Sequence, residues 1–244
     1  MATPLTPVQQ QIFEYFPIGT HPRRTLEAEV CAYATGNVLD IGCGRTAPML
    51  KLLRGKVDQL YGIDLVDFDT EIPDARLLNA DVCNMDFLQT DSIHLAYSKA
   101  VMEHIPDCKS ALGEIARVLN PGGHYIFLTP NFWDYGSLVA HIVPNRFHDV
   151  LVSTITDRAE EDVFPTYFRC NTKSTIYRLA KESGLEVTRF DYMGQHPAYL
   201  TFSRPLFWFG SQYERVIRSI PQLGFLRGWI FCILQKPVRN GPNG

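Results

Sequence analysis

Short apolar runs alternate with amphipathic segments along the first half of the chain. The runs lie at residues 37–41, 60–65, 75–81, 92–98 and 124–130. Each run is brief, and its apolar residues do not alternate with polar ones. This is the pattern of strands that are buried on both faces of a parallel sheet. The pattern therefore predicts five buried strands.

Helical periodicity appears between and around these runs. Leu26, Val30 and Tyr33 are spaced to share one face, which predicts a helix over residues 22–33. Comparable segments at 47–55, 110–120 and 171–185 predict further helices. Strands and helices that alternate in this way form a mostly parallel sheet covered on both faces, so we expect an α/β fold of the Rossmann-like, doubly wound type.

The alternation ends after Pro130. Residues 131–170 are rich in aromatic residues and histidine and are too many for an ordinary loop, so we interpret them as an inserted cap. Residues 186–193 and 198–204 are expected to pair as antiparallel strands at the edge of the sheet, and an aromatic, basic segment follows them.

The length and composition fit one domain. A chain of 244 residues with 45% hydrophobic content can bury a core without a partner. We expect a single domain, 1–244, whose parts are N-terminal helices (1–36), a ligand-binding core (37–130), the cap (131–170) and a C-terminal helix with edge strands and tail (171–244).

Charge, cysteine spacing and the length of apolar runs indicate which partners and which cellular compartment to expect. The net charge of −3 gives no overall positive field for nucleic acid, so we expect no nucleic-acid partner. The six cysteines form no CxxC pair and the N-terminus has no secretory pattern, which predicts reduced thiols and a cytoplasmic protein. No apolar run reaches the roughly 20 residues of a membrane span. Peripheral contact of the C-terminal segment with a membrane, and the oligomeric state, stay open.

A glycine turn follows the first predicted strand. Gly42 and Gly44 lie where ligands bind in open α/β sheets, just beyond the carboxyl end of a strand. The first glycine permits a tight turn, and the second lets the backbone approach a ligand. Asp40 lies at the strand tip, placed to engage an ammonium group, and Asp64 ends the next strand, placed to accept hydrogen bonds from ribose hydroxyls.

The glycine turn alone leaves two enzyme classes open. Its sequence, GCGRTA, also satisfies the dinucleotide fingerprint G-x-G-x-x-G/A, so a nicotinamide-dependent oxidoreductase remains an alternative at this point. That class would also need hydride-transfer residues beside the nicotinamide, which the glycine turn alone does not supply.

Five segments in order make the chain resemble the class I S-adenosylmethionine-dependent methyltransferases. They are VLDIGCGRTAPMLKLL, YGIDL, NADVCNMDF, SKAVMEHIPD and ALGEIARVLNPGGHYIFLTPN, and together they span residues 38–131. The resemblance implies that S-adenosyl-L-methionine is the cofactor. It also implies the cofactor-binding residues, namely Asp40, Gly42 and Gly44 at the methionine moiety, Asp64 at the ribose, Asp81 and Val82 at the adenine, and Ser98 beneath the sulfonium.

Two histidines are catalytic candidates, and the resemblance points to the first of them. His104 belongs to a Glu-His pair after the fourth strand, where it could act as a general base or fix the loop by hydrogen bonds. His148, in the expected cap, is a second candidate, with His141 seven residues before it. No tight ligand spacing such as HxxxH is present, so we expect no metal.

Together these observations predict methyl transfer from S-adenosyl-L-methionine to a small-molecule acceptor, with oxygen favoured as the acceptor atom. A sulfonium methyl group is already electrophilic, so positioning the acceptor matters more than acid–base chemistry. A non-catalytic module that binds the cofactor without turnover is the second hypothesis.

Overall fold

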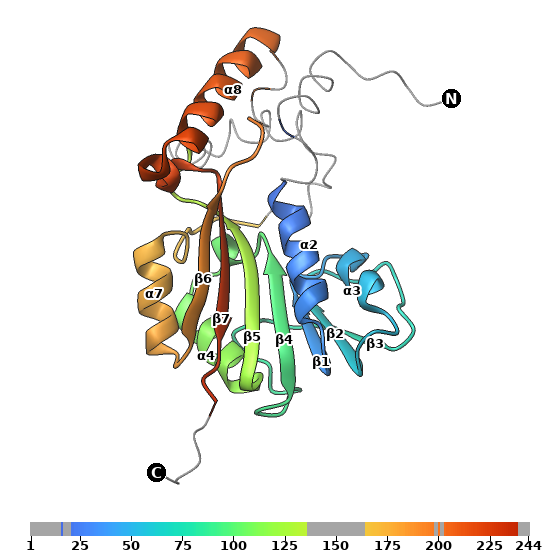
Figure 1. Ribbon diagram of the computed structural model, residues 1–244. Helices are drawn as coiled ribbons and strands as arrows, with labels where there is room; N and C mark the ends of the chain where they lie inside the picture. Colours follow the sequence, from blue (N-terminus) through green and yellow to red (C-terminus); the bar gives the residue numbers. More distant parts are fainter. Residues whose placement is uncertain (1–15, 17–20, 136–163, 198–199, 201–202, 239–244) are drawn as a thin grey trace, which may run out of the picture. The chain divides into compact units, whose positions relative to one another are not determined.

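The computed structural model describes residue 16 and residues 21–135, 164–197, 200 and 203–238 (Figure 1). The strands are β1 (Asn37–Ile41), β2 (Gln59–Asp64), β3 (Ala75–Asn79), β4 (Ile93–Lys99), β5 (Leu119–Pro130), β6 (Glu186–Met193) and β7 (Trp229–Gln235). The helices are α2 (Pro22–Tyr33), α3 (Pro48–Leu53), α4 (Cys108–Val118), α7 (Lys173–Glu182) and α8 (Arg204–Ser219), with 3-10 turns η2 (Met102–His104) and η5 (Pro221–Leu226).

The strands form one sheet in the order β3-β2-β1-β4-β5-β7-β6. Strands β1 to β5 pair in parallel, and the order reverses between β1 and β4. Strand β7 runs the other way: the Gly122 N–H, early in β5, donates to the Lys236 carbonyl at 2.8 Å, and the Lys236 N–H donates to Gly123 at 2.9 Å. The predicted Rossmann-like fold with a mostly parallel sheet is confirmed.

The predicted helices form on the expected faces. In α2, Leu26 and Val30 are fully buried, and Figure 1 shows this helix in front of the sheet with α4 behind it. The N-cap of α4 is Asp107, whose carboxylate accepts from both the backbone N–H and the hydroxyl of Ser110, at 3.0 and 2.7 Å. An aspartate at this position satisfies orphan N–H groups of the first turn.

The strand that pairs with β6 is not the one that the sequence predicted. Residues 186–193 form β6 as predicted, but the strand beside it is β7, which fills the place between β5 and β6. The prediction that residues 198–204 pair with β6 was wrong, because Ser203 is the N-cap of α8 and Arg204 is the first residue of that helix. The run Ile230–Leu234 is fully buried, so its continuous apolar character reflects an interior strand and not a tail.

The chain divides into two compact units by its internal contacts. The first, here called the sheet unit, comprises Leu26–Thr129, Phe164–Asp191 and Phe231–Gly244. The second, here called the α8 unit, comprises Met1–Thr25, Pro130–Val163 and Tyr192–Ile230. Most of the expected cap, residues 136–163, lies outside the described residues, so its boundaries at 131 and 170 stay a prediction, as does the single-domain division. No helix among the described residues is long and apolar enough to cross a bilayer.

Candidate functional site

The glycine turn lies at the carboxyl end of β1, where the strand order reverses. Gly42 and Gly44 both have positive φ angles, 70° and 72°. A Cβ on Gly42 would clash with the Val101 side chain, whereas a Cβ on Gly44 would meet no atom within 4 Å. The turn is therefore closed on the Val101 side and open beside Gly44, where a ligand can approach the backbone.

Asp64 joins the turn to the end of β2. Its carboxylate accepts hydrogen bonds from the Gly44 N–H at 2.7 Å and from the Leu65 N–H at 2.8 Å. The first contact bridges twenty positions of sequence and holds the open side of the turn against the neighbouring strand. A half-buried carboxylate with oxygen lone pairs left beside this opening can also accept from hydroxyl groups of a ligand.

Asp40 and Tyr97 form a buried polar pair beneath the turn. They are register partners on β1 and β4 and are 4% and 1% exposed. Burial raises the pKa of Asp40 to about 7, the Tyr97 hydroxyl opposes that increase, and the Asp64 charge adds to it. The Tyr97 hydroxyl faces the Asp40 carboxyl, but it completes no hydrogen bond of good geometry among the described residues, so it can also bond a ligand.

These features fit S-adenosyl-L-methionine. The opening beside Gly44 gives room for backbone contact, the Asp40 carboxyl can accept from an ammonium group, and Asp64 can accept from ribose hydroxyls. Tyr97 was missed by the sequence reasoning. The signal that could have found it is the register of two adjacent parallel strands, which sets Tyr97 beside Asp40.

Asp81 and Val82 follow β3. The Asp81 side chain is exposed and accepts from the Cys83 N–H at 2.8 Å, and Val82 is buried. This is a local turn in which the carboxylate orders its own backbone. The second carboxylate oxygen is not used by that contact, so recognition of adenine by these two residues stays a prediction.

Ser98 lies near the end of β4 as predicted, in register with Ile41. Its side chain is fully buried, and its hydroxyl shares a hydrogen bond of 2.7 Å with the Tyr125 hydroxyl. The Ser98 side chain thus serves the interior of the sheet, and a contact of this residue with the cofactor stays a prediction.

His104 is held by the loop in which it lies. Its Nδ1 lies 3.0 Å from the Pro165 carbonyl oxygen, and its Nε2 lies 3.9 Å from a carboxylate oxygen of Glu103. A carbonyl oxygen only accepts, so Nδ1 carries the hydrogen, and in the neutral ring Nε2 is the basic nitrogen. The half-buried ring also contacts Phe164 edge-on.

A buried polar network surrounds Glu103. Its carboxylate accepts from the Thr129 hydroxyl at 3.0 Å, and the Asn171 amide donates to the same hydroxyl at 2.7 Å. The Glu103 carbonyl accepts from the Tyr167 N–H at 2.7 Å. This network fastens residues 164–171 to the ends of β4 and β5. The sequence reasoning did not single out Thr129 and Asn171, because their partners are distant in sequence and neither belongs to a recognisable motif.

The second catalytic candidate cannot be placed. His148 and His141 lie outside the described residues. The described residues hold no group of three or more His, Cys, Asp or Glu side chains arranged for a metal.

A comparison with models of protein families shows which family the chain belongs to. The model described as "Methyltransferase domain" matches residues 21–189, which contain every described residue of the site. The chain belongs to this methyltransferase family. It is a class I S-adenosylmethionine-dependent methyltransferase by family, and its cofactor is S-adenosyl-L-methionine.

Two curated relatives show the degree of similarity of this methyltransferase to known proteins. It is 30% identical over 104 residues to a ubiquinone biosynthesis O-methyltransferase of Acinetobacter baylyi, over 38% of this chain and 43% of that protein. It is 30% identical over 100 residues to 27-O-demethylrifamycin SV methyltransferase of Amycolatopsis mediterranei, over 37% of each chain. The alignments thus span about two fifths of the length of these curated relatives.

A solved structure extends the likeness of fold to nearly the whole methyltransferase. The geranyl diphosphate C-methyltransferase of Streptomyces coelicolor, solved with Mg2+, geranyl diphosphate and S-adenosyl-L-homocysteine, superposes with a TM-score of 0.55 over 96% of this chain and 100% of that chain. At 12% identity this likeness concerns the fold alone.

Proposed function

We propose that this protein transfers the methyl group of S-adenosyl-L-methionine to a hydroxyl oxygen of a small molecule. The observation that carries the proposal is the glycine turn with its two carboxylates, Asp40 and Asp64, inside a matched methyltransferase domain. The preference for oxygen is supported by the two curated relatives, whose names place their methyl groups on oxygen or describe an O-demethylated substrate.

In this proposal Gly42 and Gly44 form the cradle of the cofactor, Asp40 faces its ammonium group and Asp64 its ribose. The cofactor supplies an electrophilic methyl group, which the acceptor attacks in line with the bond to sulfur. Asp81 and Val82 border the adenine, and the Ser98 backbone lies beneath the sulfonium. These assignments extend the resemblance residue by residue to positions that the fold gathers at one end of β1, β2, β3 and β4.

His104 is proposed as the general base for a hydroxyl acceptor. A hydroxyl must lose its proton as the new carbon–oxygen bond forms, and the His104 Nε2 is the nitrogen that can take it. The Glu103 carboxylate, 3.9 Å away, would stabilise the resulting imidazolium. The Pro165 carbonyl fixes the ring so that Nε2 and not Nδ1 is available. His148 remains an alternative base.

The test is a turnover assay with S-adenosyl-L-methionine carrying a labelled methyl group and a panel of phenols, aliphatic alcohols, amines and thiols. We expect S-adenosyl-L-homocysteine and labelled product with at least one hydroxyl acceptor. The His104→Gln variant should lose about 100-fold in kcat on that acceptor with little change in KM, because general-base catalysis contributes about that much. His94→Gln, at the other end of β4, is the matched control.

Two outcomes would contradict the proposal. Labelled product with amines or thiols but with no hydroxyl acceptor would refute the assignment to oxygen. Tight cofactor binding without product from any acceptor would favour a non-catalytic cofactor-binding module.

A further inference from the structure

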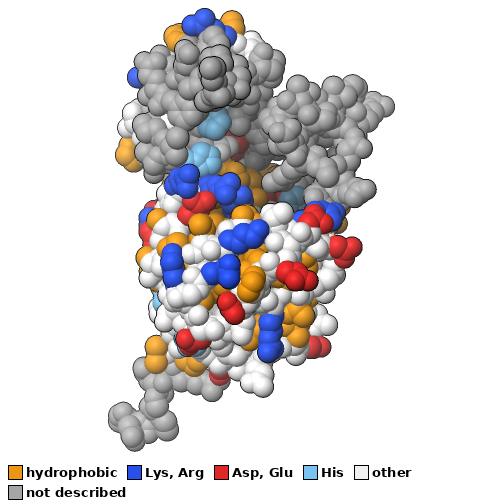
Figure 2. All heavy atoms as spheres, turned by 90° about the vertical axis from the view of Figure 1, so that its right-hand side faces the viewer, with side chains coloured by type: hydrophobic (Ala, Val, Ile, Leu, Met, Phe, Trp, Pro, Cys, Tyr) orange, Lys and Arg blue, Asp and Glu red, His pale blue; other side chains and the backbone are white. Residues whose placement is uncertain are grey.

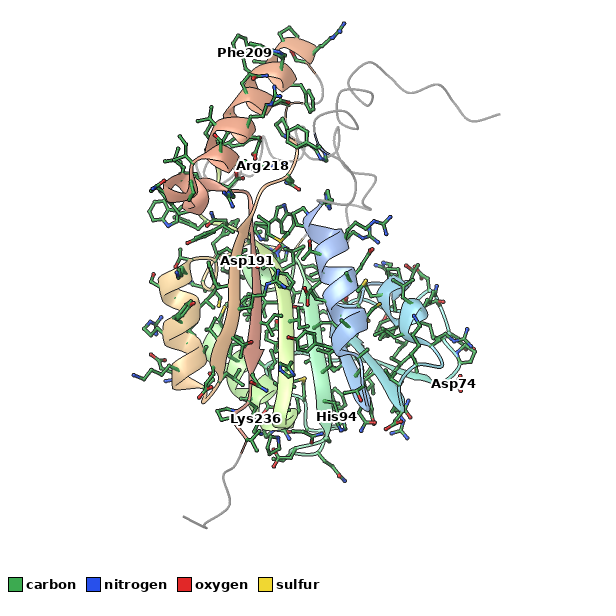
Figure 3. All side chains as sticks on the ribbon, viewed as in Figure 1. Asp74, His94, Asp191, Phe209, Arg218 and Lys236 are labelled. Atoms are coloured by element: carbon green, nitrogen blue, oxygen red, sulfur yellow. The ribbon has the colours of Figure 1, made fainter. Side chains whose placement is uncertain are left out.

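The solvent-facing side of α8 carries large apolar side chains. Phe209 is 65% exposed, more than any other large hydrophobic residue of the described chain, and Figure 3 shows it on α8 together with Arg218. The other exposed apolar residues of the helix are Leu206, Trp208 and Val216, and the exposed Ile220 follows as its C-cap. Scattered apolar residues are normal on protein surfaces, but a contiguous group marks an interaction site.

The exposed residues are spaced as one stripe. Leu206, Phe209 and Val216 follow one another at intervals of three and seven, which places them on one side of α8, and Ile220 follows four residues later at the C-cap. The opposite side of α8 is already buried through five other residues, which are Phe207, Gly210, Ser211, Glu214 and Ile217. The helix therefore has a second apolar face beyond the one that its own unit uses.

The exposed charges of α8 are all positive. Residues 203–230 contain four arginines and one acidic residue. Arg204, Arg215 and Arg218 are exposed, whereas the acid, Glu214, is 2% exposed. The whole chain has more acidic than basic residues, 26 against 23, and the face of the sheet unit drawn in Figure 2 mixes both signs. The exposed side of α8 is thus a basic, aromatic surface on an acidic protein.

We propose that α8 docks on an anionic membrane surface, with the stripe of Leu206, Phe209, Val216 and Ile220 entering the interface between headgroups and acyl chains. Arg204 and Arg215 would contact the lipid phosphates, and Trp208 would lie at headgroup depth. An apolar face bordered by arginine and tryptophan is the composition of helices that lie in the membrane plane. With 16 residues α8 is too short to span the bilayer, so in this proposal it lies in the plane of the membrane.

The charges select lipid over a second copy of the chain. In a twofold dimer through this surface, α8 would meet the same surface of its partner, and the arginines of one copy would approach those of the other. Anionic headgroups instead complement every exposed charge of the helix.

The test is co-sedimentation of the full chain, saturated with S-adenosyl-L-homocysteine, with large vesicles. Vesicles of phosphatidylcholine are compared with vesicles that contain about one third phosphatidylglycerol. We expect the protein to partition to the phosphatidylglycerol vesicles at least about tenfold more strongly, and to be released when salt is raised to about 0.5 M. Equal partition to both vesicles, or to neither, would overturn the proposal.

Substitutions locate the contact. The double variant Phe209→Ser with Val216→Ser should reduce partition at least about tenfold, because two inserted side chains are lost. Phe87→Ser, at an exposed aromatic residue of the sheet unit, is the matched control and should bind vesicles normally. Both variants should bind S-adenosyl-L-homocysteine as the unsubstituted protein does, which shows that they are folded. A concentration-dependent dimer that the double variant abolishes would instead assign the surface to a second copy.

Discussion

At the scale of single residues, the glycine turn combines positions with different tolerance for a side chain. Gly42 has no room for a Cβ because of Val101, whereas Gly44 has room but a positive φ angle. The two glycines are therefore constrained by different forces: steric exclusion together with conformation at Gly42, and conformation alone at Gly44.

This difference predicts unequal stabilities. Gly42→Ala should destabilise the fold by about 2–4 kcal/mol, the sum of left-handed strain and overpacking, and Gly44→Ala by about 1–2 kcal/mol from strain alone. Denaturant unfolding of the two variants measures the gap. The double variant Gly42→Ala with Val101→Ala should recover the overpacking part. Equal losses for both single variants, without recovery in the double variant, would contradict the geometry described for the turn.

The raised pKa of Asp40 predicts that the affinity for the cofactor depends on pH. Its pKa in the free protein is raised to about 7 by burial, so near pH 7 much of the population carries a proton. An ammonium group of the cofactor favours the ionised carboxylate, so binding should release a proton at pH 6–7 and affinity should rise with pH through 7. Titration calorimetry in buffers of different ionisation enthalpy counts that proton.

The Asp40→Asn variant is the control for this step. It should release no proton and show a flat affinity between pH 6 and 8. Proton release that is unchanged in the variant would assign the titration to another group.

Sequence reasoning worked at the residue scale where a motif fixes local geometry, and failed where contacts are distant. Gly42, Gly44 and Asp64 lie together as the spacing indicates. Tyr97 and Asn171 were missed because only the register of β1 with β4 and the docking of residues 164–171 bring them to their partners.

At the scale of elements, α8 buries an acid on its inner face. Glu214 is 2% exposed, and burial together with the Asp134 charge raises its pKa to about 8, against the opposing effect of Arg218 and Arg227. A carboxyl whose pKa is higher in the folded than in the unfolded state binds more protons when folded between pH 4.5 and 8. Stability should therefore fall as pH rises through that window.

Glu214→Gln, which mimics the neutral acid, tests this directly. We expect the variant to melt at least about 2 °C above the unsubstituted protein at pH 9, with the difference vanishing at pH 5. Glu182→Gln, at a more exposed glutamate on α7, is the matched control. A variant that is destabilised at pH 9 would mean that the ionised carboxylate is favourably paired.

The strands show what an apolar pattern can and cannot indicate. Strands β1 to β5 and the helices among them were predicted because each is a local pattern. Strand β7 was missed because a continuous apolar run beside aromatic residues has no period, and its neighbours β5 and β6 are known only once the sheet is assembled.

At the scale of the whole molecule, the Rossmann-like fold gathers the candidate site residues at one end of its sheet. The sheet unit contains the glycine turn that we propose as the cofactor cradle, and the fold class follows from the alternation of strands and helices. The acceptor does not follow, because residues 136–163 of the expected cap are outside the described chain and folds of this type serve many substrates.

The most direct test of the central claim is calorimetric titration of S-adenosyl-L-homocysteine into the protein and into Asp64→Ala. We predict binding at one site per chain, weakened by about 1–3 kcal/mol in the variant through lost ribose hydrogen bonds. Asp67→Ala, at an exposed acid three residues further on, should bind as the unsubstituted protein does. The absence of binding to folded protein, or equal affinity in all three, would contradict the claim that this turn holds the cofactor.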